Sequence, residues 1–127
     1  MKFGYTILYV EDVKKSIQFY EAAFGFRAKF VDESGDFGEL ASGETALGFS
    51  SHKLLRTIGK HPKAADPDAP CFEIALVTDD VPAAVDRAVG AGATLKQPPK
   101  QMPWGQTVAY VVDLDGVLVE ICTPVAA

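Results

Sequence analysis

The chain carries one pattern twice, and this duplication constrains its fold more than any other feature. Segment 6–13, which ends in Glu-Asp-Val, is matched by segment 74–81, which ends in Asp-Asp-Val. The two copies align at Tyr5 with Glu73, Leu8 with Leu76, Asp12 with Asp80, and Ile17 with Val85. Each copy is too long for a solenoid repeat and short for an independent domain. We therefore expect two units that share a core, with a ligand cleft where they meet.

The first half has the pattern of a βαβββ module. An apolar run over 3–10 is followed by Asp12, a residue that caps helices well, and by a helical stripe that stops at Gly25. The shorter strands are expected at 26–31, 37–41 and 45–50.

The second half repeats this order. Asp80 is the expected cap of its helix, with Pro82 tolerated in the first turn. The strands are expected at 72–78, 94–96, 107–112 and 117–123. We interpret 1–127 as a single domain, made of module 1 at about 1–51, a linker at about 52–70, and module 2 at about 71–124.

Composition limits the classes of function. The 127 residues carry a net charge of −5, which argues against nucleic-acid binding because phosphate contacts need clustered Lys and Arg. No apolar run approaches the ~20 residues of a membrane span, and the first residues enter a strand pattern directly, so the expected location is the cytoplasm. Cys71 and Cys122 are expected to be buried free thiols and not a disulfide.

Two sets of motifs resemble one known family. The first half contains Tyr-Val-Glu-Asp-Val, Phe-Tyr-Glu and Phe-Gly-Phe within 9–26, and the second contains Trp-Gly and Asp-Leu-Asp-Gly-Val-Leu-Val-Glu within 104–120. This combination resembles the vicinal oxygen chelate superfamily, which includes glyoxalase I, extradiol dioxygenases and the bleomycin resistance proteins. The resemblance implies an α+β fold in which two βαβββ modules form a curved mixed sheet with a cleft.

The resemblance also implies where a metal would bind. The enzymes of the superfamily use four positions, which in this chain are Tyr5, Gly48, Glu73 and Glu120. Gly48 has no side chain, and the phenol of Tyr5 must lose a proton with an ordinary pKa near 10 before it binds a metal well. We therefore expect no cofactor. The alternative is a divalent metal held weakly by Glu73 and Glu120.

The bleomycin resistance branch implies a different use of the cleft, namely sequestration of flat, cationic ligands between aromatic rings. Phe37 lies in a segment that resembles the strand offering a Phe, and Trp104 lies in a loop that resembles the one offering a stacking Trp. The predicted ligand-binding residues are Tyr5, Phe37, Glu39, Phe49, Glu73, Trp104, Tyr110 and Glu120.

The leading hypothesis is a homodimeric, metal-free protein that binds a planar or cationic small molecule and catalyses no reaction. One alternative is a metal-dependent lyase or isomerase resembling glyoxalase I. Another is a ligand chaperone in a biosynthetic pathway. His52 and His61 have no partner at a recognisable spacing and are expected at the surface or in the linker.

Overall fold

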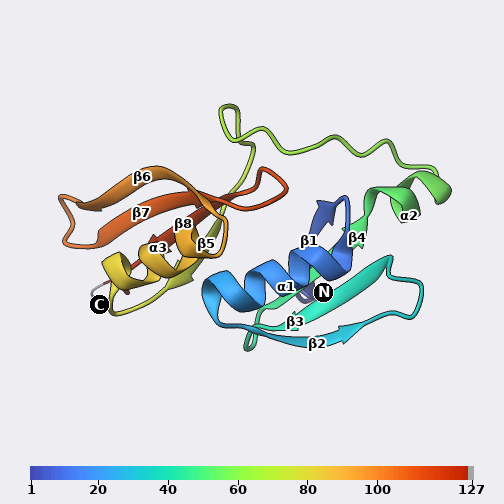
Figure 1. The fold of residues 1–127 in the computed structure, drawn as a ribbon, viewed down its shortest axis with the longest axis horizontal. Coiled ribbons are helices and arrows are strands. Elements are labelled where there is room, and N and C mark those ends of the chain that lie inside the picture. The colour runs from blue at the N-terminus through green and yellow to red at the C-terminus, as the bar shows by residue number, and fades with distance from the viewer. Residues whose placement is uncertain (126–127) are drawn as a thin grey trace. The chain divides into compact units, whose positions relative to one another are not determined.

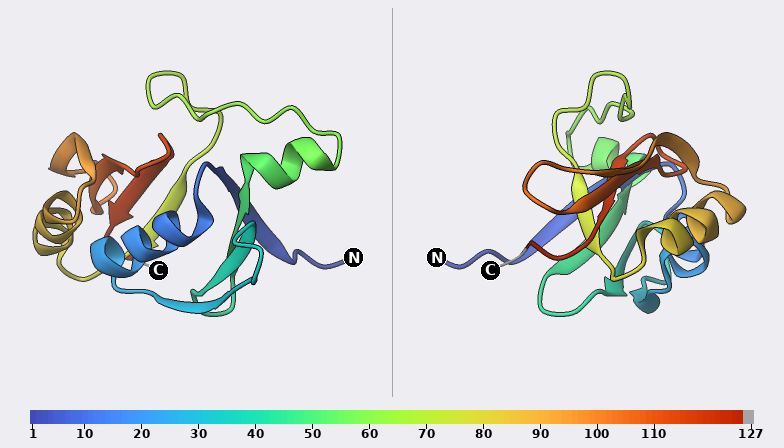
Figure 2. Two further views of the ribbon diagram at one scale, coloured as in Figure 1. Left: turned by 45° about the vertical axis from the view of Figure 1, so that its right-hand side comes forward. Right: turned by 90° about the vertical axis from the view of Figure 1, so that its left-hand side faces the viewer.

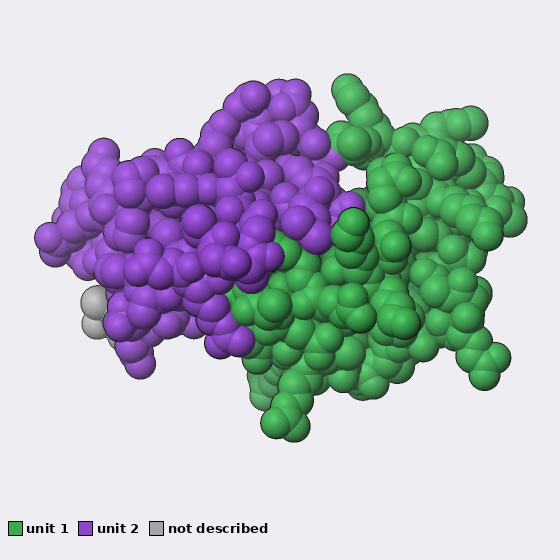
Figure 3. All heavy atoms as spheres, viewed as in Figure 1, with its two compact units in different colours: residues 1–64 green, residues 65–127 purple. Residues whose placement is uncertain are grey.

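The duplicated pattern corresponds to two compact units, coloured separately in Figure 3. The structure is a computed structural model and describes residues 1–125. Unit 1 covers Met1–Ala64 and unit 2 covers Ala65–Ala127. Each contains one four-stranded mixed sheet with a helix packed along it (Figure 1), so the expected pair of βαβββ modules is confirmed.

In unit 1 the strand order is β1-β4-β3-β2. β1 runs parallel to β4, and the other neighbours are antiparallel. The helix α1 packs against β2, β3 and β4. The elements are β1 (Tyr5–Val10), α1 (Val13–Phe24), β2 (Arg27–Val31), β3 (Phe37–Ala41), β4 (Ala46–Ser51) and α2 (His52–Thr57).

Unit 2 repeats this topology in the order β5-β8-β7-β6, again with its first strand parallel to its last. The helix α3 packs against β6, β7 and β8. The elements are β5 (Ile74–Val77), α3 (Val81–Gly90), β6 (Thr94–Gln101), β7 (Thr107–Val112) and β8 (Leu118–Cys122).

The strand registers show that the duplication is structural. In unit 1, Ile7 lies opposite Gly48, and in unit 2, Ala75 lies opposite Glu120. Ile7 and Ala75 each follow an aligned position, Tyr5 or Glu73, by two residues. Gly48 and Glu120 therefore occupy equivalent places in the two sheets.

The helix boundaries follow from local chemistry. The Asp12 carboxylate accepts a hydrogen bond from the backbone N–H of Lys15 at 3.0 Å, and Asp80 accepts one from Ala83 at 3.1 Å. Each bond satisfies a backbone donor that has no partner within its helix. α1 ends at Gly25, whose φ of 78° lies in the left-handed region that glycine adopts without strain. The two caps and the glycine stop were all predicted from the sequence.

The strand β6 is longer than predicted. The sequence interpretation ended it at Lys96 and assigned the following residues to a loop because of Pro98 and Pro99. The strand instead continues to Gln101, with register shifts on both sides of Gln97. β6 is an edge strand, so the missing backbone N–H groups of the two prolines cost the sheet few hydrogen bonds at such an irregularity.

The segment that the sequence interpretation assigned to a linker begins with the short helix α2. Ser51 caps it by accepting a hydrogen bond from the N–H of Leu54 at 3.0 Å. From there to β5 the chain has no regular helix or strand, as the green segment in Figures 1 and 2 shows. Lys96 of unit 2 forms an ion pair with Asp68, which holds the end of this segment on unit 2. Within residues 1–125, no helix has the length and apolar character needed to cross a bilayer.

His52 begins the segment that was expected to be a linker, but the alternative that it lies at the surface is wrong. Its side chain is buried, and its Nδ1 lies 2.7 Å from Oε1 of Glu11. Because these residues are far apart in the sequence, no local spacing could have indicated the pair.

Candidate functional site

The main polar cluster of unit 2 lies on one face of its sheet. Val119 and Ile121 of β8 are buried, whereas Glu120 between them is partly exposed. Side chains alternate along a strand, so Glu120 projects from the face of the sheet opposite Val119 and Ile121. This face points away from α3. We call the face of the β5–β8 sheet that carries Glu120 the carboxylate face.

Tyr110 and Glu120 are direct neighbours on the carboxylate face. They lie opposite each other in β7 and β8, and the Tyr110 hydroxyl donates a hydrogen bond of 3.0 Å to Oε1 of Glu120. Partial burial, together with Glu120 and Glu73, raises the pKa of Tyr110 to about 12. The phenol therefore stays protonated at neutral pH and acts as a donor to carboxylates.

Glu73 completes this cluster from the residue before β5. Desolvation raises the pKa of the Glu73 carboxyl, and the negative charge of Glu120 raises it further, while the Tyr110 hydroxyl opposes the shift. The two carboxylates therefore repel each other electrostatically, as expected for like charges on neighbouring strands. The structure thus brings together three of the predicted site residues: Glu73, Tyr110 and Glu120.

Cys122 belongs to the same environment, although the sequence interpretation did not include it. Burial, followed by hydrogen bonding to Glu120 and the charges of Glu120 and Glu73, raises the pKa of the Cys122 thiol to about 11. Cys122 follows Glu120 by two positions, so strand alternation alone could have placed both residues on one face.

The negative charge of this cluster has no cationic partner in the described chain. Among the described residues, Lys29 pairs with Glu39 and Lys96 pairs with Asp68, and His52 Nδ1 contacts Glu11. Neither Glu73 nor Glu120 takes part in any of them. A cation from outside the chain would relieve the repulsion between the two carboxylates.

In unit 1 the face of the sheet away from α1 is rich in aromatic side chains, and we call it the aromatic face. Tyr5, Ile7 and Tyr9 of β1 are all exposed there. Phe37 of β3 lies on the same face and contacts Phe30, a residue absent from the sequence prediction, with ring centroids 5.7 Å apart. The aromatic face offers broad, flat apolar surface.

Phe49 does not belong to that face, so its prediction as a ligand-binding residue is wrong. It is fully buried, and its ring meets Tyr20 of α1 edge to face, with centroids 5.2 Å apart. Phe49 follows Gly48 directly, and adjacent strand residues point to opposite faces. Its role is in the core of unit 1.

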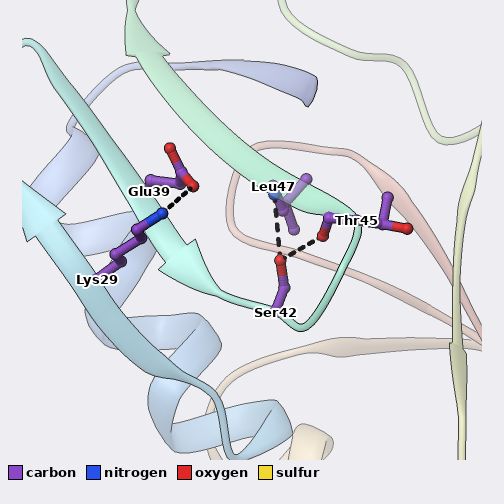
Figure 4. Close-up of polar contacts among 5 residues, drawn as sticks. All are labelled: Lys29, Glu39, Ser42, Thr45 and Leu47. Carbon is purple, nitrogen blue, oxygen red and sulfur yellow. Dashed lines mark hydrogen bonds and ion pairs between the residues drawn. The ribbon is translucent and has the colours of Figure 1, made fainter. Parts of the chain in front are cut away.

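Glu39 is already neutralised. Its Oε1 lies 3.4 Å from Nζ of Lys29 across β2 and β3, as Figure 4 shows. Figure 4 also shows the neighbouring β3–β4 turn, where the Ser42 hydroxyl donates to the carbonyl of Thr45 and accepts from the N–H of Leu47. Compared with Glu73 and Glu120, Glu39 is a weaker attractor for a ligand cation.

The residues at the four implied metal positions do not fit a four-ligand metal centre. A Cβ at Gly48 would lie 3.7 Å from each of three atoms, Ile7 Cγ1, Phe37 Cζ and the backbone oxygen of Gly38, and this position has no side-chain ligand of its own. Residues 1–125 contain no group of three or more His, Cys, Asp or Glu side chains arranged to hold a metal ion. The carboxylates of Glu73 and Glu120, together with the phenol of Tyr5, form a weak, hard donor set.

Trp104 lies in the turn between β6 and β7 and is 63% exposed. Its Nε1 donates a hydrogen bond of 2.7 Å to Oε1 of Gln106, and Nε2 of Gln106 donates to the carbonyl of Thr123. This relay orients an exposed indole ring. An oriented exposed ring suits stacking on a flat ligand, because little freedom remains to be lost on binding.

Comparison with known proteins identifies the family. Residues 2–121 match the model of the family described as Glyoxalase/Bleomycin resistance protein/Dioxygenase superfamily. The chain belongs to this superfamily. The expected resemblance is thereby confirmed at the level of the superfamily.

Individual relatives agree with this assignment. Among proteins with sequence similarity, the uncharacterized protein YraH of Bacillus subtilis is 27% identical over 124 residues, which cover 95% of this chain and 97% of YraH. A solved structure of a glyoxalase-related enzyme from Fulvimarina pelagi has a TM-score of 0.83 at 22% identity, covering 98% of this chain and 88% of that one. TioX from Micromonospora sp. ML1 has a TM-score of 0.73 at 21% identity, covering 97% of this chain and 98% of TioX. At these identities the two structures support the fold alone.

Proposed function

We propose that this chain is a small-molecule binding protein that holds a flat, cationic ligand through the carboxylate face of unit 2. The observation that carries the proposal is the cluster of Glu73, Tyr110 and Glu120. It combines two neighbouring carboxylates, one of them with a raised pKa, and no Lys, Arg or His within residues 1–125 pairs with either of them.

A ligand cation would change the energetics of this cluster. Placed against Glu73 and Glu120, it would lower the pKa of Glu73, because its positive charge would offset the repulsion from Glu120. The Tyr110 hydroxyl, which donates to Glu120, would hold that carboxylate in place. Charge-assisted hydrogen bonds to both carboxylates would then supply specificity for a cation over a neutral molecule of the same shape.

Trp104 supplies the apolar part of the proposed recognition within unit 2. Its indole ring is exposed and is oriented by Gln106. Stacking of this ring on a planar ligand would contribute about 0.5–1.5 kcal/mol beyond the area that it buries. Binding of this kind requires no bond to be made or broken.

The donor set gives no support to metal-dependent catalysis, so we derive no reaction step through a metal. The assignment to the bleomycin resistance branch, the homodimer and the cytoplasmic location stay predictions. Size-exclusion chromatography with light scattering tests the homodimer directly.

A matched pair of probes tests the proposed function. Benzamidinium is a planar cation, and benzamide is its neutral counterpart of nearly the same shape. By calorimetry in the presence of a chelator, we expect the wild-type protein to bind benzamidinium at least about tenfold more tightly than benzamide.

Two variants assign that preference to the cluster. Glu120→Gln should remove most of it, whereas Glu44→Gln, which changes an exposed carboxylate in a turn of unit 1, should leave it intact. Equal affinities for the two probes in the wild-type protein would contradict the proposal.

A further inference from the structure

The structure places one more polar group beside the carboxylate cluster. Gln97 of β6 lies opposite Tyr110 of β7, and Tyr110 lies opposite Glu120 of β8. Cross-strand partners present their side chains on the same face of a sheet, with Cβ atoms about 5 Å apart. Gln97, Tyr110 and Glu120 therefore form one row across the carboxylate face.

The amide of Gln97 has a property that its neighbours lack. Its Nε2 atom is buried and has no hydrogen-bond partner within residues 1–125. Leaving a buried donor unpaired is costly, and each such group in a native protein calls for an explanation, one of which is a functional contact with a bound molecule. Tyr110 does not meet this need, since its hydroxyl lies within hydrogen-bonding distance of Glu120 instead.

The backbone around Gln97 is unusual as well. The β6–β7 register shifts between Leu95 and Gln97, and again between Gln97 and Lys100. Bulges of this kind change the direction of a side chain and are frequent beside functional sites. Both irregularities flank the one residue of β6 that pairs with Tyr110.

We propose that Gln97 is a ligand-contacting residue whose amide N–H groups donate to an acceptor on the same molecule that places its cation against Glu73 and Glu120. This inference rests on the proposed function and specifies its ligand class. The ligand carries a carbonyl, hydroxyl or ring-nitrogen acceptor in addition to its cationic nitrogen. Gln97 and Glu120 are two strands apart, so the two groups are separated by up to about 10 Å.

A third probe tests this assignment. It is benzamidinium that carries a carboxamide at the para position, which adds an acceptor to the same planar cation. We expect the wild-type protein to prefer it over benzamidinium by about two- to tenfold, the range for one additional hydrogen bond. Gln97→Leu, which keeps a similar volume, should abolish this preference, so that the two cationic probes bind the variant with equal affinity.

Gln101→Leu is the matched control. Gln101 is an exposed glutamine of the same strand and lies opposite Thr107 of β7. Thr107 is an odd number of positions from Tyr110, so Thr107 and Gln101 lie on the other face of the sheet. This variant should retain the preference for the carboxamide probe. In the ¹H–¹⁵N spectrum, the side-chain NH₂ signal that disappears in Gln97→Leu should shift on addition of the carboxamide probe and move less with benzamidinium.

The outcomes separate the two proposals. The affinity ratio of the carboxamide probe to benzamidinium is compared between the wild-type protein and Gln97→Leu. If this ratio is the same in both proteins, Gln97 is structural and this inference is overturned, while the proposed function stands. If neither probe binds the wild-type protein, the cation site itself is wrong, and the ligand role of Gln97 is rejected with it.

Discussion

The hydroxyl of Tyr110 donates a 3.0 Å hydrogen bond to Glu120 across β7 and β8. This bond joins two residues of the carboxylate face and fixes the protonation state of one of them. The pKa of Tyr110 is raised to about 12, so in the folded protein the phenol keeps its proton across the range in which an ordinary tyrosine loses it.

The titration of Tyr110 gives the first prediction. Tyrosine ionisation is followed by ultraviolet absorbance in the wild-type protein and in Tyr110→Phe. The difference between the two absorbance curves, which reports Tyr110, should have its midpoint near pH 12. Because the folded-state pKa lies above the unfolded value, the associated stability is fully present below about pH 10 and is lost as the pH rises toward 12. A difference spectrum centred near pH 10 would show that the hydroxyl is not held by Glu120.

Glu73 gives a prediction with an unusual sign. The folded-state pKa of this carboxyl is raised, so the favourable contribution of its protonated form is present at low pH and is lost as the pH rises through the folded pKa. Glu73→Gln, which is neutral at every pH, should therefore increase the free energy of unfolding at pH 7. Solvent screening keeps the gain below about 1 kcal/mol.

As a control, the unfolding of Glu73→Gln is also measured at low pH. Below the ordinary carboxyl range both forms are uncharged, so the gain should vanish in urea unfolding near pH 3. Glu44→Gln, in an exposed turn, should show no gain at either pH. A loss of stability at pH 7 in Glu73→Gln would mean that the charged form is the favoured one.

The two thiols should differ in reactivity. Both thiols are free, but the expectation that Cys71 is buried is wrong, because Cys71 is exposed. Cys122 is buried, and its pKa is raised to about 11. Since the thiolate is the reactive form, iodoacetamide at pH 8 should add one group to the native protein, and none to Cys71→Ser. Intact mass measurement distinguishes these cases, and rapid labelling of Cys122 in the folded protein would contradict the described burial.

Two glycines of unit 1 should respond differently to the same substitution. A Cβ at Gly38 would lie 2.6 Å from Ile17 Cδ1 and 3.1 Å from the Phe30 carbonyl oxygen, so in Gly38→Ala the Ile17 side chain must move and the β2 backbone must yield slightly. We expect a loss of about 1–3 kcal/mol in the free energy of unfolding. At Gly48 the nearest atoms lie at 3.7 Å, so Gly48→Ala should cost much less in the same urea titration.

The sequence predicted the parts of the fold that local signals specify. The caps at Asp12 and Asp80, the stop at Gly25 and the alternating strands lie within a few residues of the elements that they define. The extent of β6 was missed, because Pro98 and Pro99 normally exclude a strand and only the edge position admits them.

The candidate site was predicted in part, for similar reasons. Glu73 and Glu120 were predicted from the metal positions that the family resemblance implies, and Tyr110 joins them through the β7–β8 register. Phe49 was misplaced although strand alternation with Gly48 assigns it to the core. The roles of Gln97 and His52 depend on register shifts and long-range contacts, which no short sequence pattern encodes.

The most direct test of the central claim compares a ligand cation with metal ions at the same cluster. Protein purified without a chelator is titrated by calorimetry with benzamidinium and, separately, with Zn²⁺, Ni²⁺ and Mn²⁺, in both the wild type and Glu120→Gln. The account predicts benzamidinium binding that depends on Glu120 and no tight one-to-one binding of any of the three metals. Tight one-to-one metal binding that Glu120→Gln abolishes would contradict it and would assign Glu73 and Glu120 to a metal centre.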